Sequence, residues 1–246
     1  MTRRPSPATA VVAVDGPSGS GKSSVSRGVA RALGLRYLDT GAMYRAMTWA
    51  ALRDGIDLAD ADAVARTTAS ARLEWSTDPD ESRVSVDGTD VSRAIREEAV
   101  TATVSQVAAE ARTRAVLVAL QREAVQDALD AGTGIVVEGR DIGSVVLPDA
   151  DLKVWLVADP EVRAARRAAE DAAAGRVAAP TAGTLDAVVA DLARRDAHDA
   201  TRAASPATRA PDAVVVDATH LTLADVVDAV VRLVRERTGD AVDEGA

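Results

Sequence analysis

Short runs of consecutive apolar residues alternate along this chain with longer stretches in which apolar positions recur every three or four residues. The short runs are rich in Val, Ile and Leu and occupy residues 10–14, 35–38, 134–138, 152–157 and 214–216. Runs without apolar/polar alternation predict strands that are buried on both faces of a parallel sheet. The pattern therefore predicts an α/β fold in which helices cover both sides of that sheet.

Segments with the helical period lie between the predicted strands. They occupy residues 23–33, 41–53, 61–71, 93–131, 160–202 and 223–237. The first segment places Val25, Val29 and Leu33 on one face and stops at Gly34, a residue typical of helix ends. The 93–131 stretch predicts two or three helices. The 160–202 stretch predicts two helices joined by an Ala- and Gly-rich connection at 172–183, which we expect to be mobile without ligand.

Residues 72–87 follow a different pattern. Apolar and polar residues alternate in 72–76 and 83–87, and Asp-Pro-Asp-Glu separates the two segments. This predicts a small antiparallel hairpin, inserted into the domain rather than added to its main sheet. Residues 1–9 predict a flexible arm and residues 238–246 a flexible acidic tail, which leaves residues 10–237 as a single domain.

The composition narrows the classes of protein. The 246 residues are 47% hydrophobic and 27% charged, an ordinary globular mixture. The net charge of −9, the absence of Phe and the 2% aromatic content disfavour a nucleic-acid partner. The longest run without a charged residue, 99–109, is shorter than the roughly 18 residues of a membrane span. Without cysteine there are no disulfides, as is typical of a cytoplasmic protein, and we expect a monomer.

A glycine-rich segment, Gly16-Pro-Ser-Gly-Ser-Gly-Lys22-Ser23, follows the first predicted strand and opens the first predicted helix. It matches the P-loop pattern at every fixed position. Glycines let backbone N–H groups surround phosphate oxygens, and the helix N-terminus adds partial positive charge. Lys22 would reach the β- and γ-phosphates, and Ser23 would offer its hydroxyl to Mg²⁺. The candidate nucleotide-binding residues are Gly16, Pro17, Ser18, Gly19, Ser20, Gly21, Lys22, Ser23 and Ser24.

Other P-loop classes lack their own signatures here. A GTPase needs Asn-Lys-x-Asp to read guanine, but the only other lysine, Lys153, stands in Leu-Lys-Val-Trp. A helicase or motor needs nucleic-acid-binding surfaces that an acidic chain without Phe does not favour. A kinase of small molecules remains, and its second substrate needs a pocket of its own.

Further segments resemble the bacterial cytidylate kinases, in the same order as in that family. They are Asp-Gly-Pro-Ser-Gly-Ser-Gly-Lys-Ser-Ser (15–24), Leu-Asp-Thr-Gly-Ala-Met-Tyr-Arg (38–45), Asp-Val-Ser-x-x-Ile-Arg (90–96), Ser-Gln-Val-Ala-Ala (105–109), Glu-Gly-Arg-Asp-Ile-Gly (138–143) and Arg-Asp-x-x-Asp-x-x-Arg (195–202). The resemblance spans about residues 10 to 235. It implies the three-layer, adenylate-kinase-like P-loop NTPase fold, with a nucleoside-monophosphate-binding insert at about 64–110 and a helical lid at about 163–202. It also implies transfer of the γ-phosphoryl group from ATP, with Mg²⁺, to CMP or dCMP.

The resemblance assigns roles to residues at the matching positions. The acceptor site would consist of Thr40, Tyr44, Arg45, Ser105, Arg114, Arg140, Asp141, Arg195, Asp199 and Arg202. Among these, Arg45 and Arg140 would bind the acceptor phosphate, and Arg195 and Asp199 the sugar. The base would contact Ser105, Arg114, Asp141 and Arg202.

Phosphoryl transfer to a phosphate requires no general base, because catalysis consists of positioning and charge stabilisation. The candidate catalytic residues are Lys22, Arg140, Arg163, Arg167 and Arg195. The one-face spacing of Arg163 and Arg167 fits either lid arginines or a charged surface stripe. Beyond Ser23, Asp39 and Glu138 are candidates for Mg²⁺ only through water. Two alternatives stay open: another small P-loop kinase, such as one for shikimate or dephospho-coenzyme A, and a regulatory protein that binds ATP without an acceptor.

Overall fold

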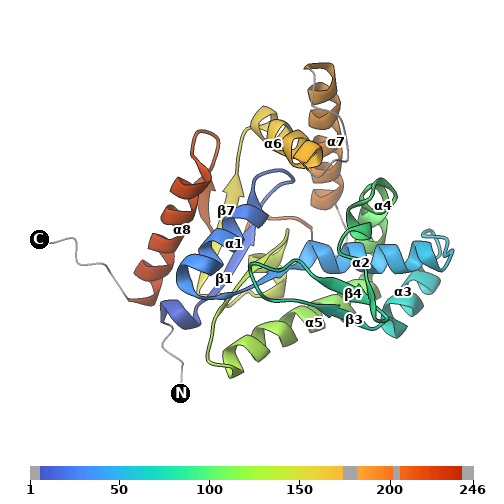
Figure 1. The fold of residues 1–246 in the computed structure, drawn as a ribbon, viewed down its shortest axis with the longest axis horizontal. Coiled ribbons are helices and arrows are strands. Elements are labelled where there is room, and N and C mark those ends of the chain that lie inside the picture. Colours follow the sequence, from blue (N-terminus) through green and yellow to red (C-terminus); the bar gives the residue numbers. More distant parts are fainter. Residues whose placement is uncertain (1–5, 174–181, 202–205, 240–246) are drawn as a thin grey trace, which may run out of the picture.

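A five-stranded parallel sheet forms the centre of the molecule, and helices cover both of its faces (Figure 1). The structure is a computed structural model, and it describes residues 6–173, 182–201 and 206–239. The strands are β1 (Val11–Asp15), β2 (Arg36–Asp39), β6 (Ile135–Glu138), β7 (Leu152–Val157) and β8 (Val214–Asp217). They lie in the order β2-β6-β1-β7-β8, with every neighbouring pair parallel. The predicted α/β fold with a parallel sheet is confirmed.

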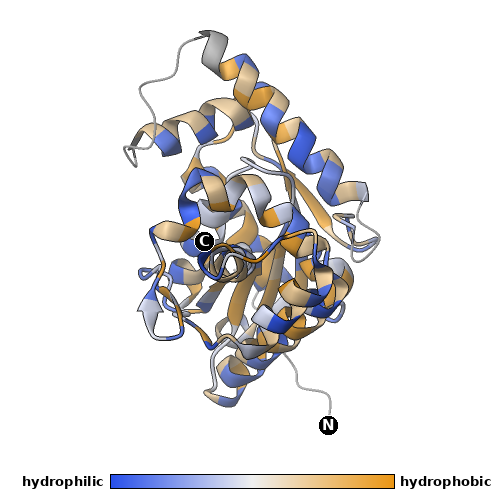
Figure 2. Ribbon diagram, turned by 90° about the vertical axis from the view of Figure 1, so that its right-hand side faces the viewer, coloured by the Kyte–Doolittle hydropathy of each residue, from blue (hydrophilic) through white to orange (hydrophobic). Residues whose placement is uncertain are grey.

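Successive residues of the strands supply two separate hydrophobic cores. Val12 and Val14 of β1 pack with α1 (Lys22–Leu33) and α8 (Leu223–Thr238) on one face. Val11 and Ala13 point to the other face, which α2 (Thr40–Arg53), α4 (Glu98–Ala109) and α5 (Ala111–Asp130) cover. Because both faces are covered, the strands consist mainly of apolar residues, as their mostly orange colour in Figure 2 shows.

A second, smaller sheet lies beside α2 and α3 (Ala61–Ser70), as Figure 1 shows. Its strands β3 (Leu73–Trp75), β4 (Val84–Val86) and β5 (Thr89–Asp90) are antiparallel. The predicted hairpin forms its first two strands. The third was not predicted, because two exposed polar residues have no apolar pattern.

Two helices, α6 (Pro160–Ala173) and α7 (Ala182–Thr201), lie side by side beyond the carboxyl ends of β1 and β7 (Figure 1). They occupy the stretch in which the sequence predicts a helical lid. Most of the expected mobile connection, Arg202, the start of the expected arm and most of the expected tail lie outside the described residues.

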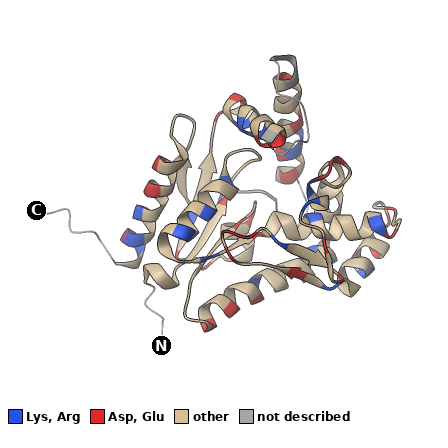
Figure 3. Ribbon diagram, viewed as in Figure 1, with Lys and Arg blue, Asp and Glu red and all other residues tan. Residues whose placement is uncertain are grey.

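Charged residues lie on helices and connecting segments, and the central strands carry few of them (Figure 3). Three of these stand at the carboxyl ends of adjacent strands, where Asp15, Asp39 and Glu138 are the last residues of β1, β2 and β6. In the part of the chain that the structure describes, no helix is long and apolar enough to cross a bilayer. The carboxyl edge of the sheet therefore carries a group of acidic side chains, at the edge where α/β proteins bind their ligands.

Candidate active site

A cavity of about 250 Å³ opens at the carboxyl edge of the central sheet, between the glycine-rich loop, α2, α4 and the α6–α7 pair. The nine predicted acceptor-site residues that the structure describes all line it: Thr40, Tyr44, Arg45, Ser105, Arg114, Arg140, Asp141, Arg195 and Asp199. The tenth, Arg202, lies outside the described residues. Ser18, Gly19, Gly21, Lys22 and Ser23 line the same cavity. The structure thus brings the candidate phosphate loop and the candidate acceptor residues to one cavity.

The glycine-rich loop connects β1 to α1 in a conformation that only glycines allow. Gly16, Gly19 and Gly21 all have positive φ angles. A Cβ atom on Gly16 would lie 2.1 Å from the carbonyl oxygen of Leu156. Gly21 is the N-cap of α1 and offers no side chain to its first N–H groups, which stay available for an anion. This local geometry is that of a phosphate-binding loop.

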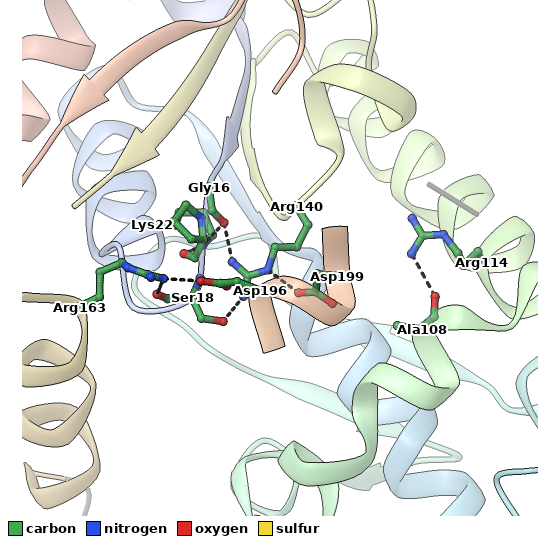
Figure 4. Close-up of polar contacts among 10 residues, drawn as sticks. Gly16, Ser18, Lys22, Ala108, Arg114, Arg140, Arg163, Asp196 and Asp199 are labelled. Carbon is green, nitrogen blue, oxygen red and sulfur yellow. Dashed lines mark hydrogen bonds and ion pairs between the residues drawn. The ribbon is translucent and has the colours of Figure 1, made fainter. Parts of the chain in front are cut away.

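Lys22 bends back onto its own loop. Its ammonium donates to the carbonyl oxygens of Gly16 at 2.9 Å and Pro17 at 2.7 Å (Figure 4). Burial of the ammonium and the nearby charge of Arg140 lower the pKa of Lys22 to about 7. Burial disfavours the charged form of Lys22, and the neighbouring cation repels it. A phosphate between the two side chains would reverse that balance.

Arg140 connects three segments of the site. Its guanidinium donates to the Gly16 carbonyl oxygen at 2.5 Å, to Ser18 Oγ at 2.5 Å and to an Asp199 carboxylate oxygen at 3.1 Å. These partners belong to the glycine-rich loop and to α7, as Figure 4 shows. Arg140 therefore stands between the loop expected to bind the donor and the residues expected to bind the acceptor.

Arg114 and Asp141 form an ion pair in the wall of the cavity. Arg114 is only 4% exposed, and its guanidinium also donates to the Ala108 carbonyl oxygen at 3.3 Å. It lies over the Tyr44 ring, with 5.3 Å between the guanidinium carbon and the ring centre. The pair presents a donor and an acceptor at fixed positions, which is what recognition of a planar polar base requires.

Two carboxylates from neighbouring strands, Asp39 and Glu138, face each other in register at the edge of the sheet. Asp39 pairs with Arg45 at 3.0 Å and caps α2 by accepting the Ala42 N–H. Burial raises the pKa of Asp39, but the charges of Arg45 and Arg96 outweigh that effect and hold the pKa below its usual value.

The pKa of Glu138 lies above its usual value, because burial and the neighbouring charge of Asp39 both disfavour its ionised form. The Tyr37 hydroxyl donates to Glu138 Oε1 at 2.5 Å. Thr40 Oγ1 donates to the Glu138 backbone oxygen at 2.7 Å. Glu138 and Asp39 therefore occupy the wall of the cavity beside the glycine-rich loop.

The arginines of α6 and α7 differ in their surroundings. Arg167 and Arg195 line the cavity, and each pairs with a carboxylate of its own helix, Asp171 at 3.0 Å and Asp191 at 2.9 Å. Arg163 does not line the cavity. It donates to the Ser18 carbonyl oxygen at 2.8 Å and to Asp196 at 2.5 Å. Arg163 is therefore buried against the glycine-rich loop and is not part of a charged surface stripe, one of the two interpretations that its spacing allowed.

Sequence reasoning gave no role to some residues of the site. Arg96 and Glu170 line the cavity, and Asp196 accepts the Ser18 N–H at 2.9 Å. Asp196 is the second residue of the Arg-Asp-x-x-Asp-x-x-Arg motif (195–202), so the sequence could have indicated its place at the site. For Glu170, no sequence pattern points to the cavity.

The family model and the relatives of about 50% identity point to the same family. A family model described as cytidylate kinase matches residues 12–236. Relatives named cytidylate kinase include those of Mycobacterium avium (strain 104), 53% identical over 94% of this chain and 97% of the relative, and Rhodococcus opacus (strain B4), 53% identical over 93% and 96%. A solved structure of an unliganded sugar kinase from Janibacter sp. HTCC2649 covers 95% of this chain and 99% of its own, with a TM-score of 0.46 and 16% identity, too distant to inform function.

The carboxylate of Asp15, the last residue of β1, predicts a pH dependence of stability. Burial raises its pKa from 3.8 to about 6, against the lowering effect of the Gly143 and Ile142 N–H groups that it accepts. A carboxyl with a raised pKa in the folded state contributes most to stability below its unfolded pKa. That contribution, about 3 kcal/mol for a shift of this size, is lost as the pH rises through about 6.

The measurement is the free energy of unfolding of the wild type and of Asp15→Asn, by urea denaturation at intervals between about pH 4 and pH 8. We expect the wild-type value minus the variant value to decrease as the pH rises to about 6 and then to level off. A difference that increases with pH would mean that the folded state favours the ionised carboxylate.

Proposed function

Because the chain belongs to the cytidylate kinase family, we infer that it transfers the γ-phosphoryl group of ATP to CMP or dCMP, giving ADP and CDP or dCDP. The observation that supports this most directly is the shared cavity. It has a phosphate-binding loop on one side and the Arg114–Asp141 pair on the other, with Arg140 between them. A regulatory protein that only binds ATP would have no use for the second half of that cavity.

The reaction needs two polyanions in contact, and the arginines of the cavity supply the compensating charge. We propose that Arg45 and Arg140 bind the phosphate of CMP, because a guanidinium can donate two parallel bonds to phosphate oxygens. Arg45 now pairs with Asp39 and Arg140 with Asp199. These carboxylates hold the guanidinium groups in place before the substrate arrives. Bound phosphate would then take over the guanidinium donors, or share them with the carboxylates, with little reorientation.

The base of CMP would contact the Arg114–Asp141 pair and Ser105. Cytosine presents an amino donor at N4 and an acceptor at N3, and uracil presents the opposite arrangement. The Asp141 carboxylate can accept from the amino group, whereas it would repel the O4 carbonyl of uracil. A buried polar group left without a partner is costly, so this pair can discriminate strongly between the two bases.

The donor would occupy the glycine-rich loop, with Lys22 at its phosphates. Lys22 donates to loop carbonyls and Asp196 accepts the Ser18 N–H, so these groups must exchange partners when ATP binds. Closure of α6 and α7 over both nucleotides would exclude water, which otherwise competes for the phosphoryl group. We propose the lid at about 163–202, the acceptor-binding insert at about 64–110, and phosphate contacts from Arg167 and Arg195. We propose a phosphate contact from Arg163 as well, which requires it to leave the Ser18 carbonyl oxygen and Asp196 on closure.

Mg²⁺ would bind through oxygen ligands beside the loop. The chain offers the hydroxyl of Ser23 and the carboxylate of Glu138, which line the same cavity. Among the described residues, no group of three or more acidic or histidine side chains could hold a metal alone. Hydroxyl and carboxylate oxygens fit Mg²⁺, which commonly takes few protein ligands and completes its shell with water and substrate phosphates. The ion would neutralise charge on the transferring group.

The direct test is a coupled assay of ADP formation with CMP, dCMP, UMP and AMP as acceptors and ATP as donor. We expect turnover with CMP and dCMP, and much lower kcat/KM with UMP and AMP. ATP consumption that is independent of any acceptor would contradict the proposal. The monomeric state and the cytoplasmic location stay predictions.

Replacing Lys22 tests the donor site. Lys22→Ala removes the cation expected at the β- and γ-phosphates, and kcat should fall by about 100-fold or more. Arg53→Ala is the matched control, because it removes an exposed cation outside the cavity that pairs with Asp54 and Asp87. Stopped assays and urea denaturation of both variants provide the comparison. A folded Lys22→Ala enzyme with turnover near that of the control would place the donor elsewhere.

Replacing Asp141 tests recognition of the base. Asp141→Asn keeps the shape but adds an amide donor, so the ratio of kcat/KM for CMP over UMP should fall by about tenfold or more. The ratio compares two substrates on one enzyme, so partial unfolding of the variant cancels. Arg140→Ala should lower activity with both substrates and leave the ratio nearly unchanged. If Asp141→Asn leaves the ratio unchanged as well, Asp141 does not read the base.

A further inference from the structure

Three consecutive residues, the last two of β1 and the glycine that follows them, each bind a different point of the segment 139–143. The Val14 carbonyl oxygen accepts the Gly139 N–H at 3.1 Å. The Asp15 carboxylate accepts the N–H of Ile142 at 2.8 Å and of Gly143 at 2.7 Å, one on each oxygen. The Gly16 carbonyl oxygen accepts from the Arg140 guanidinium at 2.5 Å. The strand that leads into the glycine-rich loop therefore also fixes the segment that contains Arg140 and Asp141.

Of the three residues Val14, Asp15 and Gly16, only Asp15 makes its contact through a side chain. That side chain does not reach the cavity. It is 4% exposed and is absent from the cavity wall, whereas Arg140 and Asp141 both belong to that wall. Both of its oxygens are used on backbone N–H groups of one short segment. Its hydrogen bonds can affect catalysis only through the residues that they orient. Its charge also acts on the ammonium of Lys22 in the neighbouring loop.

The contacts of Asp15 lie immediately after Asp141. Ile142 begins a π-helical turn, Ile142–Val146, and the Asp141 carbonyl oxygen accepts the N–H of Val145 at 2.9 Å and of Val146 at 3.2 Å. The backbone of Asp141 is thus fixed from two sides, by this turn and by the Asp15 carboxylate on the next two N–H groups. Its side chain then meets Arg114 on α5.

We propose that Asp15 is a positioning residue for the acceptor: its two-point bond to Ile142 and Gly143 sets the place of Asp141 and Arg140 against CMP. The inference rests on the proposed function. A displacement of catalytic groups by about 1 Å can cost about 100-fold in rate, so a buried bond at this point can control the reaction without touching a substrate. Because the bonds are on the acceptor side, the effect belongs to CMP more than to ATP.

A carboxylate is the side chain that suits two converging donors. Asparagine has the same shape but offers one oxygen, and its amide nitrogen would face an N–H group. Alanine leaves both N–H groups unpaired. The effect on the acceptor should therefore be graded, with Asp15→Ala larger than Asp15→Asn.

The experiment measures kcat, KM for CMP and KM for ATP in the wild type and in both variants. We expect Asp15→Asn to raise KM for CMP by about tenfold and to lower kcat several-fold, with KM for ATP changed by less than about threefold. The ratio of kcat/KM for CMP over UMP should also fall, and it should fall further in Asp15→Ala than in Asp15→Asn. Equal increases in the two KM values, or none, would overturn the proposal.

The chain supplies a matched control at the other end of the same strand. The Asp151 carboxylate accepts the Val11 N–H at 2.8 Å, away from the cavity. Asp151→Asn disturbs a comparable carboxylate bond to the backbone of β1, so it should lower stability and leave both KM values near those of the wild type. A shift of KM for CMP in this control equal to that of Asp15→Asn would reduce Asp15 to a structural role.

A measurement on the wild type covers the case in which the Asp15 variants do not fold. The amide resonances of Ile142 and Gly143 should move together with pH, because the same carboxylate accepts the hydrogen bonds of both N–H groups. Both should also shift when CMP is added to the enzyme. Independent titration of the two amides, or no response to CMP, would overturn the proposal. The wild-type turnover with CMP in the same assays tests the proposed function separately.

Discussion

Opposite charges held together at one largely buried edge of the sheet are the constraint on which this site depends. Asp15, Asp39 and Glu138 end three adjacent strands, and the register of β2 and β6 places Asp39 directly beside Glu138. Isolated buried carboxylates are too costly to persist. Each is compensated in a different way: by two N–H groups for Asp15, by Arg45 for Asp39, and by the Tyr37 hydroxyl for Glu138.

That constraint also explains how a chain with a net charge of −9 can receive two polyanions. Among the described residues that line the cavity, seven are Lys or Arg and five are Asp or Glu. Without substrate the carboxylates balance most of the cations and hold their side chains in place. Phosphates that enter can displace the carboxylates from guanidinium groups that need little reorientation, which lowers the entropic cost of assembling the transition state. With the roles proposed for these residues, the site is preorganised for charge that arrives with the substrates.

The sequence predicted much of this architecture, because the signals involved are local. The five strands of the central sheet, the hairpin and the glycine-rich loop follow from apolar runs, turn residues and one motif. What it did not predict are the pairings between segments. Asp15 and Gly143 lie far apart in the chain, as do Arg163 and Ser18, and their contacts depend on the strand order β2-β6-β1-β7-β8. Arg114 matched a family position, but only the packing of α5 shows that its guanidinium is buried.

Composition takes on a different meaning once these contacts are known. The chain has 27 arginines and two lysines, a bias that by itself could be compositional drift. Many arginines stay exposed, such as Arg72, and need no function. At the site, however, Arg140 donates to three groups from two separate segments at once, which the single nitrogen of an ammonium on a flexible stem cannot do with the same geometry. Lys22 stands where a compact charge must fit inside a tight loop, and both of its donated bonds end on that loop. Arginine therefore suits position 140, where one side chain must reach several partners, and lysine suits position 22, where both partners belong to one tight loop.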